Sequence, residues 1–155
     1  VLLVALIIIM VMRKKNKGYF FTPPVVLPPH ARALKELDKI KQSKIWQQNR
    51  EKEFYTSVTD VLRKYILERF NINALEMTSS EIIDKVKNNS QIESDSAVDN
   101  LQQVLQLADM VKFAKQKPLQ DENDLSLMNA FFFVTQTKEV DLSEEEGKEE
   151  NEKNS

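Results

Sequence analysis

The 155-residue sequence contains no cysteine, only two glycines and a single histidine. Without cysteine, disulfide bonds and thiolate metal sites are excluded within this sequence. His30 lies in a proline-rich segment far from any acidic cluster, so neither a histidine-based triad nor a histidine-ligated metal site is expected. Gly18 and Gly147 lie outside the segments predicted to fold, so the predicted folded part cannot contain a glycine-rich phosphate-binding loop.

The acidic residues also fail to indicate a catalytic site. Pairs such as Glu36 and Asp38 are common on solvated helices, and they become catalytic only when they are buried close together. We therefore predict that the chain is not an enzyme and requires no cofactor or metal. The predicted folded part is only mildly basic, which is untypical of a nucleic-acid-binding domain.

Residues Val1 to Met12 are apolar without exception. A membrane-spanning helix needs about 20 such residues, so we expect a transmembrane helix that is cut at its N-terminal side. A signal-peptide core has a similar length, but basic residues would precede it and a cleavage site would follow. A buried core helix is the other alternative, although such helices rarely lack a polar face.

Basic and aromatic residues follow the apolar run directly. Positive charges next to a span favour the cytoplasmic side, and aromatic rings favour the membrane–water interface. We therefore predict that the span crosses the inner membrane and that the remainder of the chain is cytoplasmic. The predicted membrane-interface residues are Arg13, Lys14, Lys15, Lys17, Tyr19, Phe20 and Phe21. Prolines at 23, 24, 28 and 29 then favour an extended chain, so residues 13–30 are predicted to be a linker.

Residues 31–138 carry the spacing of apolar residues that is typical of amphipathic helices. Thr78 and Glu81 form a capping-box pattern, Asp121 is a candidate cap for the last helix, and Pro118 ends the helix before it. The apolar run at 130–134 predicts a helix enclosed by others, because a lone strand would have no partner. The prediction is an all-α bundle of about five helices, at 31–47, 50–70, 79–87, 96–115 and 122–138.

The predicted core consists of the residues that recur on one face of these helices. They are Phe54, Val58, Val61, Leu62, Tyr65, Ile82, Leu101, Leu105, Ala108, Phe132 and Phe133.

One candidate partner surface lies near the end of the helix at 96–115. Met110 and Phe113 are rotated away from its apolar stripe and alternate with Lys112 and Lys115. The simpler interpretation is that Met110 and Phe113 pack under the last helix, because a helix between neighbours often buries more than one stripe. The functional interpretation is an apolar and basic site for a protein partner.

The C-terminal segment, residues 139–155, has eight acidic residues and two lysines. It contains few apolar residues, so we predict a disordered tail that keeps the C-terminus soluble.

Three blocks in a fixed order resemble a known family: EFYTSVTDVLRKYILERF, ALEMTSSEI and LADMVKFAK, which follow PPHARALKELDKI. Residues 1–135 are similar to the cytoplasmic C-terminal region of BatD-like (Bacteroides aerotolerance) proteins and of related small single-span proteins. These proteins occur in Bacteroidetes and other Gram-negative bacteria. The sequence departs from the family at Asn71 and Asn73, where relatives often have glycine and proline.

The resemblance implies gene clusters with a MoxR-type AAA+ ATPase and von Willebrand factor A domain proteins, and a role in aerotolerance or envelope stress. It carries over no catalytic residues. The expected function is therefore a membrane-anchored adaptor domain that binds protein partners. Two alternatives stay open. In the first, the helices serve only as a structural tether for an external domain. In the second, LRKYILERF belongs to a helix-turn-helix that binds nucleic acid.

Overall fold

The computed structural model describes residues 26–140, and helices make up most of this part of the chain. It contains five α-helices and two short 3-10 helices, and no β-strand occurs between residues 26 and 140. None of the helices between residues 26 and 140 has both the length and the hydropathy of a membrane span. The predicted span at 1–12, the linker up to residue 25 and the tail from residue 141 lie outside the described residues. So do the predicted membrane-interface residues Arg13, Lys14, Lys15, Lys17, Tyr19, Phe20 and Phe21.

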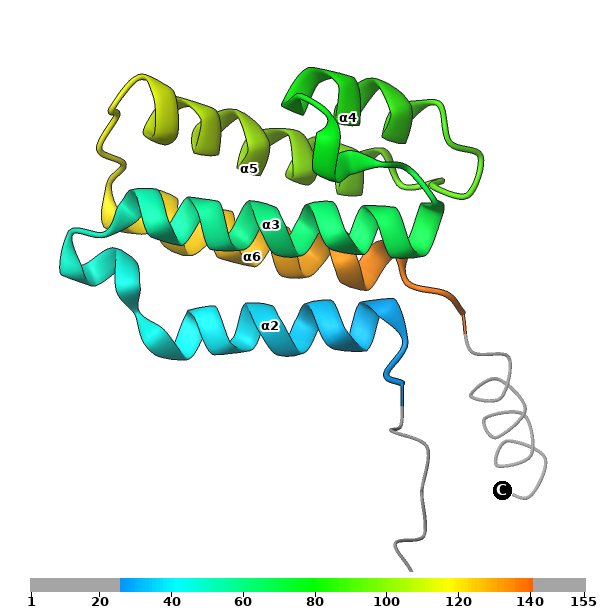
Figure 1. Cartoon of the computed structure of the whole chain (residues 1–155), viewed down its shortest axis with the longest axis horizontal. Coiled ribbons are helices and arrows are strands. Elements are labelled where there is room, and N and C mark those ends of the chain that lie inside the picture. The colour runs from blue at the N-terminus through cyan, green and yellow to red at the C-terminus, as the bar shows by residue number, and fades with distance from the viewer. Residues whose placement is uncertain (1–25, 141–155) are drawn as a thin grey trace, which may run out of the picture.

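The helices are arranged around a central pair. In order they are α2 (Pro29–Ser43), η1 (Ile45–Gln48), α3 (Glu51–Phe70), η2 (Ala74–Glu76), α4 (Ser79–Lys87), α5 (Asp95–Phe113) and α6 (Gln120–Thr137). Helices α3 and α6 lie one behind the other, with α2 on one side and α4 and α5 on the other (Figure 1). Because α6 contacts α2, α3 and α5, it is enclosed on three sides, as the apolar run at 130–134 predicted.

The first helix differs from the prediction at both ends. It begins at Pro29, because proline at the first helical position has no N–H to leave unpaired and its φ angle already suits a helix. His30 therefore lies in the first turn of α2 and not in the linker. The helix ends at Ser43, because Lys44 adopts a left-handed conformation with φ of 48°. Trp46 then lies in η1 and not in a continuous helix to residue 47.

The capping box at the start of α4 is confirmed. The backbone N–H of Glu81 donates to Thr78 Oγ1 at 3.3 Å, and the Thr78 N–H donates to the Glu81 carboxylate at 2.7 Å. This backbone N–H lowers the pKa of Glu81, because it stabilises the ionised carboxylate. The preceding segment begins at Asn71, whose φ of 56° ends α3 in the conformation that glycine adopts most readily.

Replacing Thr78 with alanine is expected to lower the free energy of unfolding by about 1 kcal/mol, because an orphan N–H of α4 loses its acceptor. Urea unfolding followed by circular dichroism measures this change. Thr78→Ser keeps the hydroxyl and is the matched control, with a smaller expected effect. An equal loss in both variants would mean that the methyl group of Thr78, and not its oxygen, supports the helix.

The last helix begins earlier than predicted, and its cap is a different residue. Leu119 occupies the cap position, and its N–H donates to the Glu122 carboxylate at 2.7 Å. Asp121 is not the cap. It lies in the first turn of α6, where its charge interacts favourably with the positive end of the helix.

Most of the predicted core is confirmed. Nine of the residues are buried: Phe54, Val58, Leu62, Tyr65, Ile82, Leu101, Leu105, Ala108 and Phe133. Val61 is only partly buried against this core. The prediction for Phe132 is wrong, since 41% of this residue is exposed. Each residue of a helix is rotated by about 100° from the last, so three consecutive phenylalanines cannot all face α3.

Polar contacts connect α3 with α6 inside the bundle. The Tyr55 hydroxyl donates to Asn123 Oδ1 at 2.9 Å and lies 3.3 Å from Ser126 Oγ. Further along α3, the Tyr65 hydroxyl lies 3.0 Å from Oγ1 of Thr137, the last residue of α6. Because hydrogen bonds need specific distances, these contacts fix how far α6 is shifted along α3.

Candidate interaction surface

The end of α5 presents apolar side chains to solvent. Phe113 is 81% exposed and Met110 is 49% exposed. The simpler interpretation, in which both residues pack under the last helix, is therefore wrong. The buried side of the same helix includes the predicted stripe, Val98, Leu101, Leu105, Ala108 and Val111. Exposed large apolar side chains that lie together are typical of binding sites.

Lys112 was predicted to belong to this surface, but its side chain is partly buried against α3. Its ammonium group donates to Thr59 Oγ1 on α3 at 2.8 Å. Partial burial lowers the pKa of Lys112, and the nearby Arg63 guanidinium lowers it further, while Asp60 and Asp109 oppose this shift. Lys112 therefore connects α5 with α3, and its partly buried ammonium group is less accessible to a partner than the sequence suggested.

The chain reverses direction directly after Phe113. Lys115 is exposed and adopts a left-handed conformation with φ of 53°, and the N–H of Gln116 donates back to the Met110 carbonyl at 3.2 Å. Helix α5 therefore ends before Pro118, which is buried. Leu119 follows, and 73% of it is exposed.

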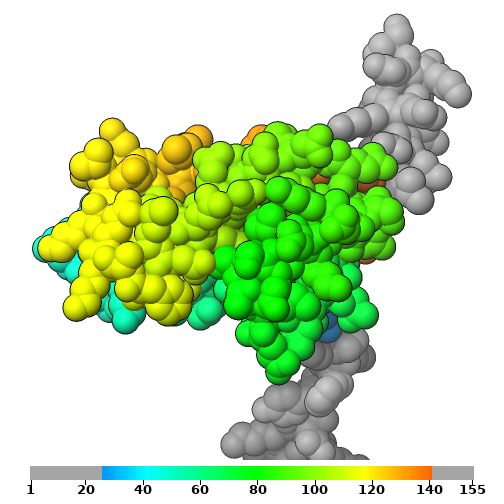
Figure 2. Space-filling view, turned by 90° about the horizontal axis from the view of Figure 1, so that it is seen from above, coloured from blue at the N-terminus to red at the C-terminus, as the bar shows by residue number. Residues whose placement is uncertain are grey.

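We call Met110, Phe113, Lys115 and Leu119 the corner patch. They belong to the end of α5 and to the loop that joins it to α6. In Figure 2 this part of the chain, in yellow, forms one end of the molecule. The patch keeps three of the four predicted surface residues and adds Leu119. The sequence contained a signal for Leu119, since it is a lone apolar residue between a proline and the acidic start of a helix.

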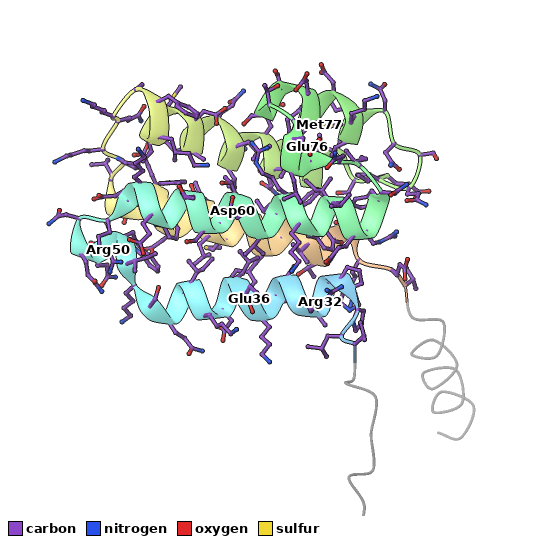
Figure 3. All side chains as sticks on the ribbon, viewed as in Figure 1. Arg32, Glu36, Arg50, Asp60, Glu76 and Met77 are labelled. Atoms are coloured by element: carbon purple, nitrogen blue, oxygen red, sulfur yellow. The ribbon has the colours of Figure 1, made fainter. Side chains whose placement is uncertain are left out.

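The connection between α3 and α4 bears on the helix-turn-helix alternative. It spans residues 71–78 and includes η2, so it is longer than the three or four residues typical of that motif. Arg63 on α3 holds it by donating to the carbonyl oxygens of Ala74 and Met77. Figure 3 shows Glu76 and Met77 of this connection on the side of α3 where α4 lies. The α3–α4 pair thus differs from the geometry of a helix-turn-helix.

A groove of about 370 Å³ lies between α4 and α5. Its polar lining includes Ser79, Ser80, Asp84, Lys87 and Asp109. Histidine, the commonest general base, is not among its lining residues, and we assign the groove no reaction. Among residues 26–140, no group of three or more metal-ligating side chains lies close enough together to hold an ion.

A second apolar surface was missed by the sequence reasoning. Leu125, Met128 and Phe132 on α6 are exposed, with 67% of Met128 accessible. Their spacing of three and four residues places them on one side of the helix. A signal was present, since the run at 130–134 is apolar on all sides and helices contact α6 on only three of them.

Comparison with known proteins identifies no relative. No protein-family model matches the chain, and no curated protein or solved structure matches it either.

Proposed function

We propose that the helical bundle is a protein-interaction domain that residues 1–12, as a transmembrane helix, hold at the cytoplasmic face of the inner membrane. In this proposal it acts as an adaptor of a BatD-like protein, together with a MoxR-type AAA+ ATPase and von Willebrand factor A proteins, in aerotolerance or envelope stress. The corner patch carries the proposal of an interaction domain, because it exposes Phe113 almost fully on a folded surface. The apolar run, the basic cluster after it and the three ordered sequence blocks support the membrane and partner assignments.

The double variant Met110→Ser and Phe113→Ser tests the proposal. Both residues are exposed, so the free energy of unfolding is expected to change by less than about 0.5 kcal/mol per substitution. Exposed aromatic residues that act as hot spots contribute at least about 2 kcal/mol to binding. We therefore expect recovery of the ATPase or the von Willebrand factor A protein to fall at least about tenfold. The measurement is a quantitative pull-down from membranes with the full chain as bait.

A matched control replaces two exposed apolar residues elsewhere, Leu75→Ser and Val140→Ser. This variant is expected to recover the partner as the unaltered chain does. If the unaltered chain repeatedly recovers neither class of partner, the specific assignment is wrong. If the Met110 and Phe113 variant unfolds, the corner patch is a structural part of the bundle and the surface interpretation fails.

A further inference from the structure

A groove lies between the end of α2, η1 and α6, on helices other than those of the corner patch. Its volume is about 340 Å³, and its apolar lining consists of Trp46, Leu127, Met128 and Phe131. It lies toward the end of the bundle that Arg50 marks in Figure 3, because α2 runs from Arg32 toward η1. Trp46 and Leu127 are buried in the bundle, whereas 67% of Met128 is exposed at the groove.

The groove continues onto the uncovered side of α6. Met128 belongs both to the groove and to the exposed row of Leu125, Met128 and Phe132. This row covers about two turns of helix, because its first and last members are seven positions apart in the sequence. An apolar surface of this length matches the apolar face of a second helix, whose anchoring residues recur at three, four and seven positions.

The charges beside the groove differ between its two sides. Lys41, in the last turn of α2, and Lys44, the left-handed residue that follows the helix, both line the groove. Neither lysine has an ion pair with any residue between 26 and 140, whereas Lys39 on the same helix pairs with Glu36. Asp124 lines the opposite side, on α6. A ligand that fits must therefore combine an apolar face with acidic groups toward α2 and basic or neutral groups toward Asp124.

We propose that this groove binds an amphipathic helix of a protein partner, with an acidic flank against Lys41 and Lys44. The apolar face of that helix covers Met128, Phe131 and Phe132. A helix suits the groove better than a single anionic amphiphile does, because the exposed row extends along α6 beyond the groove itself. The proposal is independent of the corner patch, since the two surfaces share no residue.

The test uses the full chain and a synthetic 16-residue helical peptide without tryptophan. The peptide carries leucines at three and four residue intervals, with glutamates on one flank and lysines on the other. Trp46 is the only tryptophan of the chain and lines the groove, so its fluorescence reports binding at this place. We expect a saturable change in Trp46 emission. In the variant Lys41→Glu and Lys44→Glu the Kd is expected to rise at least about tenfold, and a peptide with lysines in place of the flank glutamates should restore binding.

The matched control is Lys35→Glu, which is on α2 but about a third of a turn around the helix from Lys41, and which is not part of the groove lining. It changes the net charge in the same direction, and we expect less than a twofold change in Kd. Met128 is exposed, so we expect Met128→Ser to leave the fold intact. This variant should weaken binding of the original peptide without altering the preference for the glutamate peptide over the lysine peptide.

Four results would overturn the proposal. Equal affinity for the glutamate and lysine peptides would show that Lys41 and Lys44 select nothing. A Trp46 response to anionic vesicles but not to the peptide would assign the groove to lipid. Sedimentation that shows a dimer, broken by Met128→Ser, would assign it to a second copy of the chain. Peptide binding only after removal of residues 141–155 would assign it to the chain's own acidic tail.

Discussion

Replacing Phe133 with alanine is expected to destabilise the bundle by about 3–5 kcal/mol, while Phe132→Ala costs less than about 1 kcal/mol. Phe133 is fully buried, and its ring meets that of Tyr65 edge to face, with 6.0 Å between the ring centroids. Truncation removes the buried ring and leaves a cavity that close-packed neighbours fill only in part. Domains of this kind have a total stability of about 5–15 kcal/mol, so the expected loss is a large share of it.

Urea unfolding of both variants in the full chain measures the difference in the free energy of unfolding. Phe132→Ala is the matched control, because it removes the same atoms at the neighbouring position. The result also tests which phenylalanine faces the core. A large loss for Phe132→Ala with little change for Phe133→Ala would mean that α6 is rotated relative to the described arrangement, and the exposed row on α6 would then not exist.

The two phenylalanines also show how far pattern reasoning reaches. The positions of the five helices followed from apolar spacing and from local signals such as the capping box at Thr78. The orientation of α6 did not follow, because its run at 130–134 is apolar on all sides and contains no periodic signal for the buried face. Its neighbours α2, α3 and α5 decide that face, and those neighbours are distant in the sequence.

Two helix ends could not be predicted from the sequence either, because they lack the glycine or asparagine that usually marks such an end. Lys44 and Lys115 both adopt left-handed conformations, which glycine and asparagine favour and lysine does not. Asn71 also adopts this conformation, and asparagine is a usual signal for the end of a helix. The end of α3 was therefore predicted correctly, whereas α2 was extended past its true end and α5 was drawn beyond Phe113.

For the candidate surfaces too, features that depend on local spacing were predicted, whereas those that depend on contacts between distant segments were not. Rotation of Met110 and Phe113 off the buried stripe was visible in the sequence, so the place of the corner patch was predicted. The burial of Lys112 was not, because its partner Thr59 lies on another helix. The groove beside Trp46 was missed altogether, since it combines residues from three elements that only the folded chain brings together.

Removing the Tyr55 hydroxyl is the second change with a large expected effect. In Tyr55→Phe the oxygen of Asn123 loses its donor, and Asn123 is only 2% exposed. A buried acceptor without a partner costs about 1–3 kcal/mol, because it has given up water without compensation. The double variant Tyr55→Phe and Asn123→Leu removes both polar partners, and it is expected to recover part of the loss.

The same hydroxyl makes stability depend on pH at the alkaline end. Burial raises the pKa of Tyr55 to about 12, the hydrogen bond with Ser126 opposes this shift, and the charge of Glu122 adds to it. In the unfolded chain a tyrosine ionises near pH ~10. Because the folded pKa is the higher one, the folded chain holds the proton more tightly, and the stabilisation is complete below pH ~10 and is lost as the pH rises toward 12.

Urea unfolding between pH ~9 and ~11 therefore gives a falling stability for the unaltered chain and a shallower fall for Tyr55→Phe, with tyrosinate absorbance identifying the group that ionises. The slope does not vanish, because burial also raises the pKa of Tyr65. Tyr65→Phe is the matched control, and it leaves the contacts of Tyr55 in place. If the slope of Tyr55→Phe equals that of the unaltered chain, Tyr55 ionises alike in the folded and unfolded states. Its hydroxyl would then be open to water, and the contact that fixes α6 along α3 would not form in solution.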